Sequence, residues 1–360
     1  MNLSFDDSGC VSPHTRKVKT MNENAVSTDA VVGIDVAKQK VDLYAVNNGK
    51  GKSKVFDNTH AGHKDTQNWL RERGFVPAQT HVCMEATGPY SESLATALVS
   101  GGWKVSVVNP ARIKGFAQGE LVRNKTDRAD AALLARFCAA MKPSLWEPPP
   151  AAFRQLRGWV DRLQALKDMR QQEMNRIEAL EASEQPDVLA HVNTHVIWLD
   201  NEIAKLARDI DDHIDRHPAL KADAELIASI PGVGKTTVAK VLAYAGDVRR
   251  FDSAKALAAF IGLSPRQRQS GTSVRGRTMM SRAGHKALRH ALYMPGLVAR
   301  RHNKALKIFG DRLSAAGLAP KAVIGAVMRK LAHFIYGVIK SGKPFDLKKA
   351  MPTLDFQDGN

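Results

Sequence analysis

Short runs rich in β-branched residues punctuate residues 30–110, and further along the chain apolar residues recur every three or four positions. The runs VVGIDVA and VDLYAVN predict two strands joined by a short polar turn. THVCMEA and WKVSVVN predict two more, each after a helical stretch. A hairpin followed by strand-helix-strand predicts a mixed α/β sheet over residues 30–145.

A helix is predicted to follow Lys125, because DRADAALLARFCAAM places small and apolar residues on one face. These residues are Ala131, Leu134, Ala135 and Cys138. The proline-rich run KPSLWEPPPAAF then indicates a domain boundary near residues 142–150.

Residues 151–218 are predicted to be helical, with an interruption at Pro186. An apolar stripe recurs every three or four residues: Leu156, Trp159, Leu163, Leu166 and Met169. Two long antiparallel helices or a coiled-coil arm fit this pattern. A helical linker packed on its own domain fits it too.

The stretch SIPGVGKTTVAKVLA, residues 229–243, contains the Gly234-Lys235-Thr236 ending of a nucleotide-binding loop. Such a loop needs a glycine where Ser229 stands and a buried strand before it. The preceding segment KADAELIASI has a helical pattern instead. We therefore do not expect an ATP site here.

A helix-hairpin-helix explains the same stretch better, with its second helix from about Thr236 to Ala245. Gly232 and Gly234 would leave backbone N–H groups open at a helix N-terminus beside Lys235, which suits a nucleic-acid phosphate. The alternative is a tight corner between helices, in which the glycines only permit the turn.

The composition is that of a soluble globular protein with two or three domains: 360 residues, 44% hydrophobic and 25% charged. Cys10, Cys83 and Cys138 lack the spacing of a zinc site or a disulfide framework, which fits a reducing cytoplasm. No apolar run approaches the length of a bilayer span. Residues 1–29 lack the apolar core of a signal peptide and are predicted to be a disordered leader, with Met21 as an alternative start.

The positive charge is concentrated in the C-terminal third. The net charge is +17, and residues 221–350 hold 25 Lys and Arg against six Asp and Glu. Such a one-sided excess is typical of polyanion binding. The segment has no Trp to anchor it to a membrane surface. We expect nucleic acid, and no membrane, as the partner of a basic domain over residues 220–345.

Four carboxylates are placed to form a metal site. Asp35 lies inside an apolar strand, Glu85 ends another strand, and Asp127 and Asp130 lie three apart on the predicted helix. Carboxylates at strand ends and on one helix face can converge. Two Mg²⁺ ions bound there would clamp the attacking and leaving oxygens of a phosphoryl transfer.

Each carboxylate also has a structural explanation. Asp127 and Asp130 could simply be the N-cap and a first-turn acid at a helix start, and Glu85 suits an exposed strand end. Asp35 is harder to explain so, because burying a charge without a partner is costly. Gly-Ile-Asp before a hairpin also occurs in actin-like ATPases and sugar kinases, but VAK follows Asp35 where those enzymes need glycine and a hydroxyl residue.

Ser270 lies in the basic loop SPRQRQSGTSVRGRT with Arg266, Arg268, Arg275 and Arg277. Arginines hold phosphate with paired donors and stabilise the charge of a phosphoryl-transfer transition state. A serine nucleophile needs activation, and the loop holds no histidine to act as its base. Chemistry alone therefore favours a phosphate-binding loop in which Ser270 is a further donor.

The chain resembles the DEDD transposases of bacterial insertion sequences, insertion-sequence family one hundred and ten, over about residues 30–340. The resemblance rests on six blocks in this order: GIDVAK, MEATG, NKTDRADA, IPGVGKTTVAKVLAYAGD, GLSPRQRQSG and RAGHKALR. It implies a RuvC-like domain of ribonuclease H fold, a coiled-coil segment and a mainly α-helical C-terminal domain. It also implies roles for particular residues: a metal tetrad of Asp35, Glu85, Asp127 and Asp130, Ser270 as nucleophile, and Arg282 and Lys286 among the nucleic-acid contacts.

The implied reaction is cutting and rejoining of donor and target DNA in the bacterial cytoplasm, at the nucleoid. Ser270 would form a 5′-phosphoserine link, and the carboxylates with Mg²⁺ would complete a composite site shared between the protomers of a dimer or tetramer. A structured bridge RNA would choose the DNA sites by base pairing, as in other RNA-guided systems.

Two other functions stay open at this point. A RuvC-like, metal-dependent and structure-specific DNA nuclease would use the carboxylates without the serine. A non-catalytic nucleic-acid-binding protein would use only the basic domain.

Overall fold

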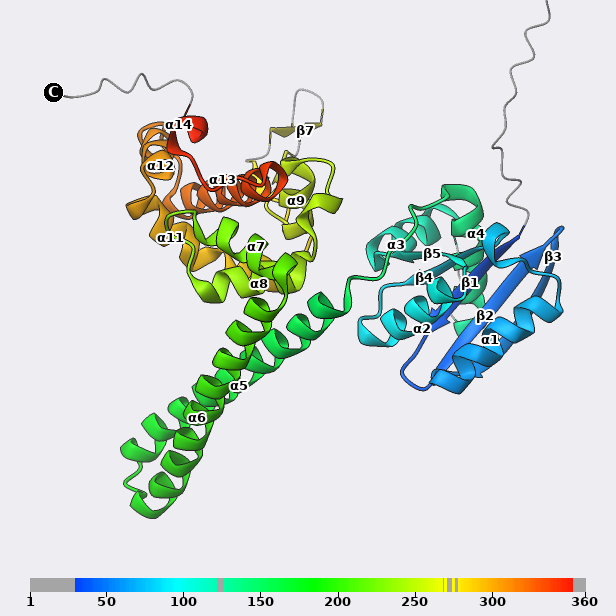
Figure 1. The fold of residues 1–360 in the computed structure, drawn as a ribbon, viewed down its shortest axis with the longest axis horizontal. Coiled ribbons are helices and arrows are strands. Elements are labelled where there is room, and N and C mark those ends of the chain that lie inside the picture. The colour runs from blue at the N-terminus through cyan, green and yellow to red at the C-terminus, as the bar shows by residue number, and fades with distance from the viewer. Residues whose placement is uncertain (1–29, 122–125, 268, 271–273, 276–277, 352–360) are drawn as a thin grey trace, which may run out of the picture. The chain divides into compact units, whose positions relative to one another are not determined.

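The computed structural model describes residues 30–121, 126–267, 269–270, 274–275 and 278–351, and the chain divides into two compact units, Met1–Pro148 and Pro149–Asn360 (Figure 1). The division falls inside the proline-rich run KPSLWEPPPAAF. Several features of the sequence lie outside the described residues: the leader with Met21, Arg268, Arg277, and the side chains of Ser270 and Arg275.

The N-terminal unit is built on a five-stranded mixed sheet in the order β3-β2-β1-β4-β5. The strands are β1 (Val31–Val36), β2 (Lys40–Asn47), β3 (Lys50–Asp57), β4 (His81–Glu85) and β5 (Lys104–Val108). β1, β2 and β3 pair antiparallel, whereas β4 is parallel to both β1 and β5. The sequence pattern predicted every strand except β3, whose run KGKSKVFD is mostly exposed and polar, as is usual for an edge strand.

Helices cover both faces of this sheet, because the strands alternate two apolar sets of side chains (Figure 1). On β1, Val32, Ile34 and Val36 face α1 (His60–Glu72) and α2 (Pro89–Ser100). The opposite face packs against α3 (Pro110–Gly119) and α4 (Asp127–Met141). The face predicted for α4 is confirmed, since Ala131, Leu134, Ala135 and Cys138 are all buried.

The C-terminal unit begins with two long helices, α5 (Ala151–Ala182) and α6 (Pro186–Arg216), which pack against each other along an arm (Figure 1). The interruption predicted at Pro186 is the first residue of α6, where proline is tolerated. Leu156, Leu163 and Leu166 of the predicted stripe are buried. The first turns of α5 and the last turns of α6 also enter the main core of this unit.

Helices make up most of the remaining chain. They are α7 (Pro218–Ala228), α8 (Lys235–Ala245), α9 (Ala254–Ile261), α10 (Lys286–Ala291), α11 (Tyr293–His302), α12 (Lys304–Ala315), α13 (Pro320–Ser341) and α14 (Leu347–Ala350). By length and composition α13 is apolar enough to cross a bilayer, which the sequence analysis did not anticipate. Its apolar side chains are buried in the core of the unit, which accounts for its composition.

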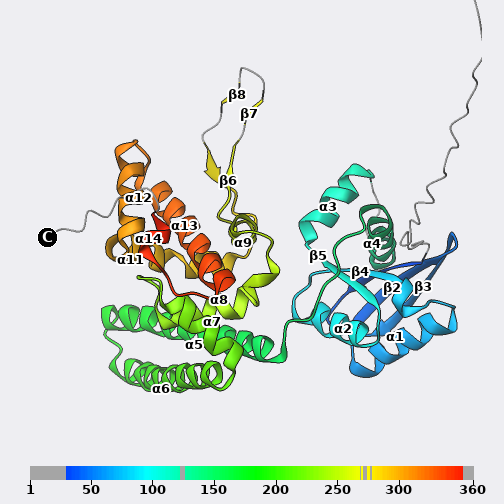
Figure 2. The same cartoon turned by 45° about the horizontal axis from the view of Figure 1, so that its top comes forward.

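The basic loop, read as irregular from the sequence, contains four short strands (Figure 2). β6 (Pro265–Arg266) pairs with β9 (Met279–Met280), and β7 (Gln269–Ser270) pairs with β8 (Val274–Arg275). The segment is therefore a hairpin, which we call the serine loop (residues 264–281). Each strand is only two residues long, too short to show an alternating pattern, which is why the pairing was not predicted.

Candidate carboxylate site and serine loop

Strand alternation directs three carboxylates to the α4 face of the sheet. Asp35 lies on β1 and is paired directly with Asp42 of β2, so both side chains project from the same face. β4 runs parallel to β1 with Met84 beside Ile34, which brings Glu85 next to Asp35 at the carboxyl ends of the strands. The sequence analysis named Asp35 and Glu85 but missed Asp42.

The N-terminus of α4 brings two more carboxylates to this face. Gly33 points to the same side as Asp35, and a Cβ there would overlap backbone atoms of Ala131 and Ala135 on α4. α4 therefore lies directly on β1, and this contact begins about one turn after the first residues of the helix. Those residues include Asp127 and Asp130. Thr126 is the N-cap, so Asp127 is not the capping residue.

Asp35 carries the clearest electrostatic signature of the site. Its pKa is raised from 3.8 to about 6. Burial is the largest cause, and the other causes are the negative charges of the surrounding carboxylates, in decreasing order Asp130, Asp127, Asp42 and Glu85. Perturbation of this kind, by burial together with like charges, is typical of functional sites. The other three predicted carboxylates, together with Asp42, thus act on Asp35.

Lys40 is the positive partner that sequence reasoning missed. Its Nζ lies 2.7 Å from Asp127 Oδ2 and 3.1 Å from Asp42 Oδ2. The hydrogen bond from Lys40 lowers the pKa of Asp127, and the two carboxylates raise the pKa of Lys40. Strand alternation puts Lys40 and Asp42 on one face of β2, but only the register against β1 shows that Asp35 shares this face.

The donor set fits a hard divalent cation, because it consists of carboxylate oxygens and leaves Asp35 with uncompensated negative charge. In the conformation described, no three His, Cys, Asp or Glu side chains among the described residues form a group that could hold a metal ion. The ammonium of Lys40 stands at Asp127 and Asp42 instead. A cation bound by Asp127 would compete with Lys40 for that carboxylate.

The serine loop is held at its root by two arginines. Arg289 Nη1 donates to the carbonyl oxygens of Ile261, at 3.2 Å, and Arg282, at 3.0 Å. Arg329 Nη1 donates to the Leu263 carbonyl at 3.2 Å. These bonds connect the two ends of the loop to α10 and α13. Arg266, Arg282 and Lys286 are exposed near this root, as polyanion contacts require.

His285, which follows the loop in the sequence, has a structural role. Its Nδ1 accepts a hydrogen bond from the Leu288 backbone N–H at 3.2 Å and caps α10. Its ring packs on Tyr244 and Phe260, and burial is the main cause that lowers its pKa. Because Nδ1 is already an acceptor in the cap, we assign no base function to it.

The Gly-Lys-Thr stretch follows a helix, α7, as predicted, and not the strand of a nucleotide-binding loop. Gly232 has φ +97° and packs against Ala299 of α11, where a Cβ would come within 2.7 Å of the backbone. Gly234 lies in open space at the N-terminus of α8. One face of the turn is thus packed, and the other is open to a ligand.

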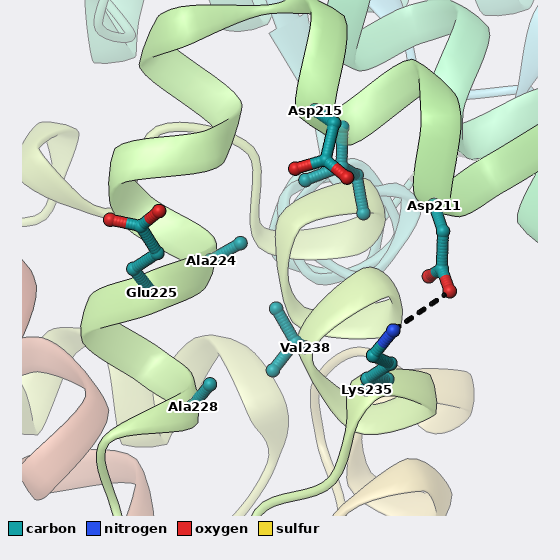
Figure 3. Close-up of a pocket in the computed structure, with 8 residues that line it drawn as sticks. Asp211, Asp215, Ala224, Glu225, Ala228, Lys235 and Val238 are labelled. Atoms are coloured by element: carbon teal, nitrogen blue, oxygen red, sulfur yellow. Dashed lines mark hydrogen bonds and ion pairs between the residues drawn. The ribbon is translucent and has the colours of Figure 1, made fainter.

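Lys235 lies beside a pocket between α6, α7 and α8 (Figure 3). Its Nζ is 3.2 Å from Asp211 Oδ2, and Asp215 and Glu225 also line the pocket. The floor is apolar, formed by residues such as Val238. Lys221 pairs with Asp215 at 3.3 Å, so these three carboxylates are balanced by two ammonium groups and the pocket stays net negative. A negative pocket disfavours a triphosphate, which agrees with the sequence-based rejection of an ATP site.

Two family profiles match the chain. The profile described as the transposase IS116/IS110/IS902 family matches residues 224–310, and the DEDD transposase profile of IS110 elements matches residues 32–181. The pilin gene-inverting proteins of Moraxella lacunata and Moraxella bovis are each 35% identical over 88% of this chain and 97% of the relative. The transposase for insertion sequence element IS1111A of Coxiella burnetii is 33% identical over 26% of this chain and 31% of that protein.

Proposed function

The chain belongs to the IS116/IS110/IS902 family of transposases and is a DNA recombinase, and we propose that it cuts and rejoins DNA through a covalent serine intermediate guided by RNA. The observation that carries the proposal is the convergence of carboxylates on Asp35. The name of the Moraxella relatives describes inversion of a gene, which is itself a cut-and-rejoin reaction.

The N-terminal unit is proposed to be a RuvC-like domain of ribonuclease H type that binds Mg²⁺. The mixed five-stranded sheet with α4 lying across β1 supports this assignment. Family membership indicates divalent metal use, and we propose that Asp35, Glu85, Asp127 and Asp130 hold two Mg²⁺ ions. The metal would neutralise phosphate charge and stabilise the oxygens that exchange at phosphorus.

Ser270 is proposed to be the nucleophile. Its hydroxyl oxygen would attack the phosphorus of a phosphodiester, forming a 5′-phosphoserine bond and releasing the 3′ oxygen as a hydroxyl. Attack by a 3′ hydroxyl of the partner strand would reverse the bond, so no nucleotide energy is needed. The position of Ser270 on a paired strand, next to a root fixed by Arg289 and Arg329, supports a positioned nucleophile.

Donor and target DNA are proposed to be selected by a structured bridge RNA, in a cytoplasmic homodimer or homotetramer. The 25 cations of residues 221–350 support backbone binding without sequence readout, which leaves the choice of sequence to base pairing. The open face of Gly234, the N-terminus of α8, and the exposed Arg266, Arg282 and Lys286 are the proposed backbone contacts, together with Arg268, Arg275 and Arg277.

A covalent-adduct assay tests this proposal. The full chain is expressed with its native flanking DNA so that any guide RNA is made, and denatured protein is then probed for attached DNA. Ser270→Ala removes the nucleophile and is compared with Ser281→Ala, a matched serine substitution at the root of the same loop. We expect an adduct in the parent and in Ser281→Ala, and none in Ser270→Ala.

Asp35→Asn separates the two chemistries. Cleavage that persists in Ser270→Ala but is lost in Asp35→Asn would identify a RuvC-like nuclease and refute serine chemistry. Nuclease treatment of the RNA in the purified complex tests guidance. Recombination that survives complete RNA removal would refute that part of the proposal.

A further inference from the structure

A cluster of cations lies on α13 and α9, outside every motif that the sequence analysis used. His333 lies four residues after Arg329 and three after Lys330 on α13, so both cations neighbour it on the helix surface. Lys255 lies in the first turn of α9, which packs against α13. Burial, and then the charges of Arg329, Lys330 and Lys255, lower the pKa of His333, so the charges of all three cations act on its ring.

No carboxylate balances this cluster within the part of the chain that the structure describes. Neither α9 nor α13 contains an Asp or Glu, and no described carboxylate forms an ion pair with Lys255, Arg329 or Lys330. Arg329 donates to neutral partners only, the Leu263 carbonyl and the Ser264 hydroxyl. Arg249 of the same unit, by contrast, is paired with Asp223 at 2.7 Å.

A second observation points to a ligand at the same place. The Nε2 atom of His333 is buried and has no hydrogen-bond partner. Buried polar atoms are nearly always satisfied, and an orphan one commonly marks a water or ion that belongs to the site. An anion bound by the three cations would neutralise the cluster. The anion itself, or a water bound to it, would satisfy Nε2.

α9, whose first turn carries Lys255, leads into the root of the serine loop at β6 (Figure 2). Arg329 bonds Ser264, and the Ser264 carbonyl accepts the backbone N–H of Ser281 at the other side of the root. One turn before Arg329, Gly325 faces Met280 of β9, where a Cβ would come within 2.6 Å of the Met280 side chain. An anion held by the cluster therefore lies beside the segment that carries Ser270.

We propose that Lys255, Arg329 and Lys330, together with His333, form a phosphate site that holds the backbone of the DNA strand presented to the serine loop. The choice of DNA as the ligand of this site rests on the proposed function. Lysine and arginine donors suit phosphate oxygens, and contacts of this kind fix the register of a strand without reading its bases.

The test is the salt dependence of DNA binding, measured by fluorescence anisotropy on the full chain with a labelled DNA duplex of about 30 base pairs and arbitrary sequence. The variant is Lys255→Gln/Lys330→Gln, which leaves Arg329 in place because it holds the loop. The control is Lys307→Gln/Lys321→Gln, an equal loss of charge at exposed lysines of the same unit. Each lost phosphate contact lowers the slope of log affinity against log salt by about 0.9, so we expect a slope smaller by about 2 and affinity weaker by about tenfold or more near 0.1 M salt.

An unchanged slope in the variant, or an equal change in the control, would overturn the proposal. So would a variant that keeps its affinity for the DNA duplex and loses it for a labelled RNA hairpin, since the site would then hold RNA. The covalent-adduct assay tests the serine chemistry separately, so failure of that chemistry leaves this DNA-binding test intact. A parent chain that binds no DNA would instead refute the proposed function.

Discussion

Replacing Asp35 with Asn is expected to stabilise the N-terminal unit while it abolishes cleavage. The pKa of Asp35 is raised from 3.8 to about 6, so the folded protein holds its proton more tightly than the unfolded chain does. An ionised Asp35 therefore destabilises the fold above pH 6. Between pH 6 and pH 3.8 the folded state takes up a proton first, and the destabilisation fades as pH falls.

The size of the expected stabilisation follows from the same rise in the pKa of Asp35. If fully expressed it corresponds to about 3 kcal/mol, and screening of a carboxylate that is only half-buried reduces this to about 1–2 kcal/mol. Asp35→Asn removes the charge at every pH. We expect the transition of the N-terminal unit to rise by about 5 °C at pH 7.5, and by about one third of that at pH 4.5.

Differential scanning calorimetry of the full chain at both pH values measures the effect. Asp65→Asn, an exposed aspartate on α1, is the matched control and is expected to change stability by less than about 0.5 kcal/mol. A variant that melts at or below the parent at pH 7.5 would refute the reasoning. A gain of the same size at pH 4.5 would show that the charge of Asp35 is not its cause.

Three further substitutions test other parts of the structure. Gly33→Ala overlaps the backbone of α4 and is expected to lower the free energy of unfolding by about 1–3 kcal/mol in chemical denaturation. Gly158→Ala, in open space on α5, is expected to raise it by about 0.5–1 kcal/mol, and a change of the same sign at both positions would contradict the packing. Lys40→Met frees Asp127, so MgCl₂ should raise its melting temperature more than that of the parent, and an equal or smaller rise would argue against competition. Arg289→Ala loses both hydrogen bonds at the loop root and is expected to lower adduct formation about tenfold without weakening DNA binding, with partial recovery in Arg289→Lys. Unchanged adduct formation in Arg289→Ala would show that Arg289 does not position the loop.

Local pattern was sufficient for much of the fold. Strand alternation and helical period depend on neighbouring residues, so they predicted β1, β2, β4, β5, α4 and the two arm helices. β3 escaped because an edge strand needs no apolar face, and the strands of the serine loop escaped because each is only two residues long. Asp35 was found because a charge within an apolar run is unusual.

The remaining parts of the site depend on pairing between segments, which a local pattern does not contain. Asp42 acquires its place from the register of β1 against β2, and Lys40 from the distance between β2 and α4. The cluster around His333 likewise arises from packing of α9 on α13. None of these residues stands in a run that looks unusual by itself.

The carboxylate site is negative and the basic domain is positive, and this difference indicates which activities should depend on metal. At the carboxylate site the negative charges of Asp130, Asp127 and Asp42 act on Asp35, and Lys40 pairs with Asp42 and Asp127, so without a metal cation we expect this site to repel DNA. Affinity for DNA must then come from the basic domain, whose cations need no metal. We therefore expect chelation with EDTA to abolish cleavage and adduct formation, restored by MgCl₂, and to leave the dissociation constant for DNA within about twofold at fixed ionic strength. Anisotropy and adduct assays on the same protein measure both quantities, and a loss of DNA affinity in EDTA equal to the loss of cleavage would mean that the carboxylates, once metal-bound, form the main DNA-binding surface instead.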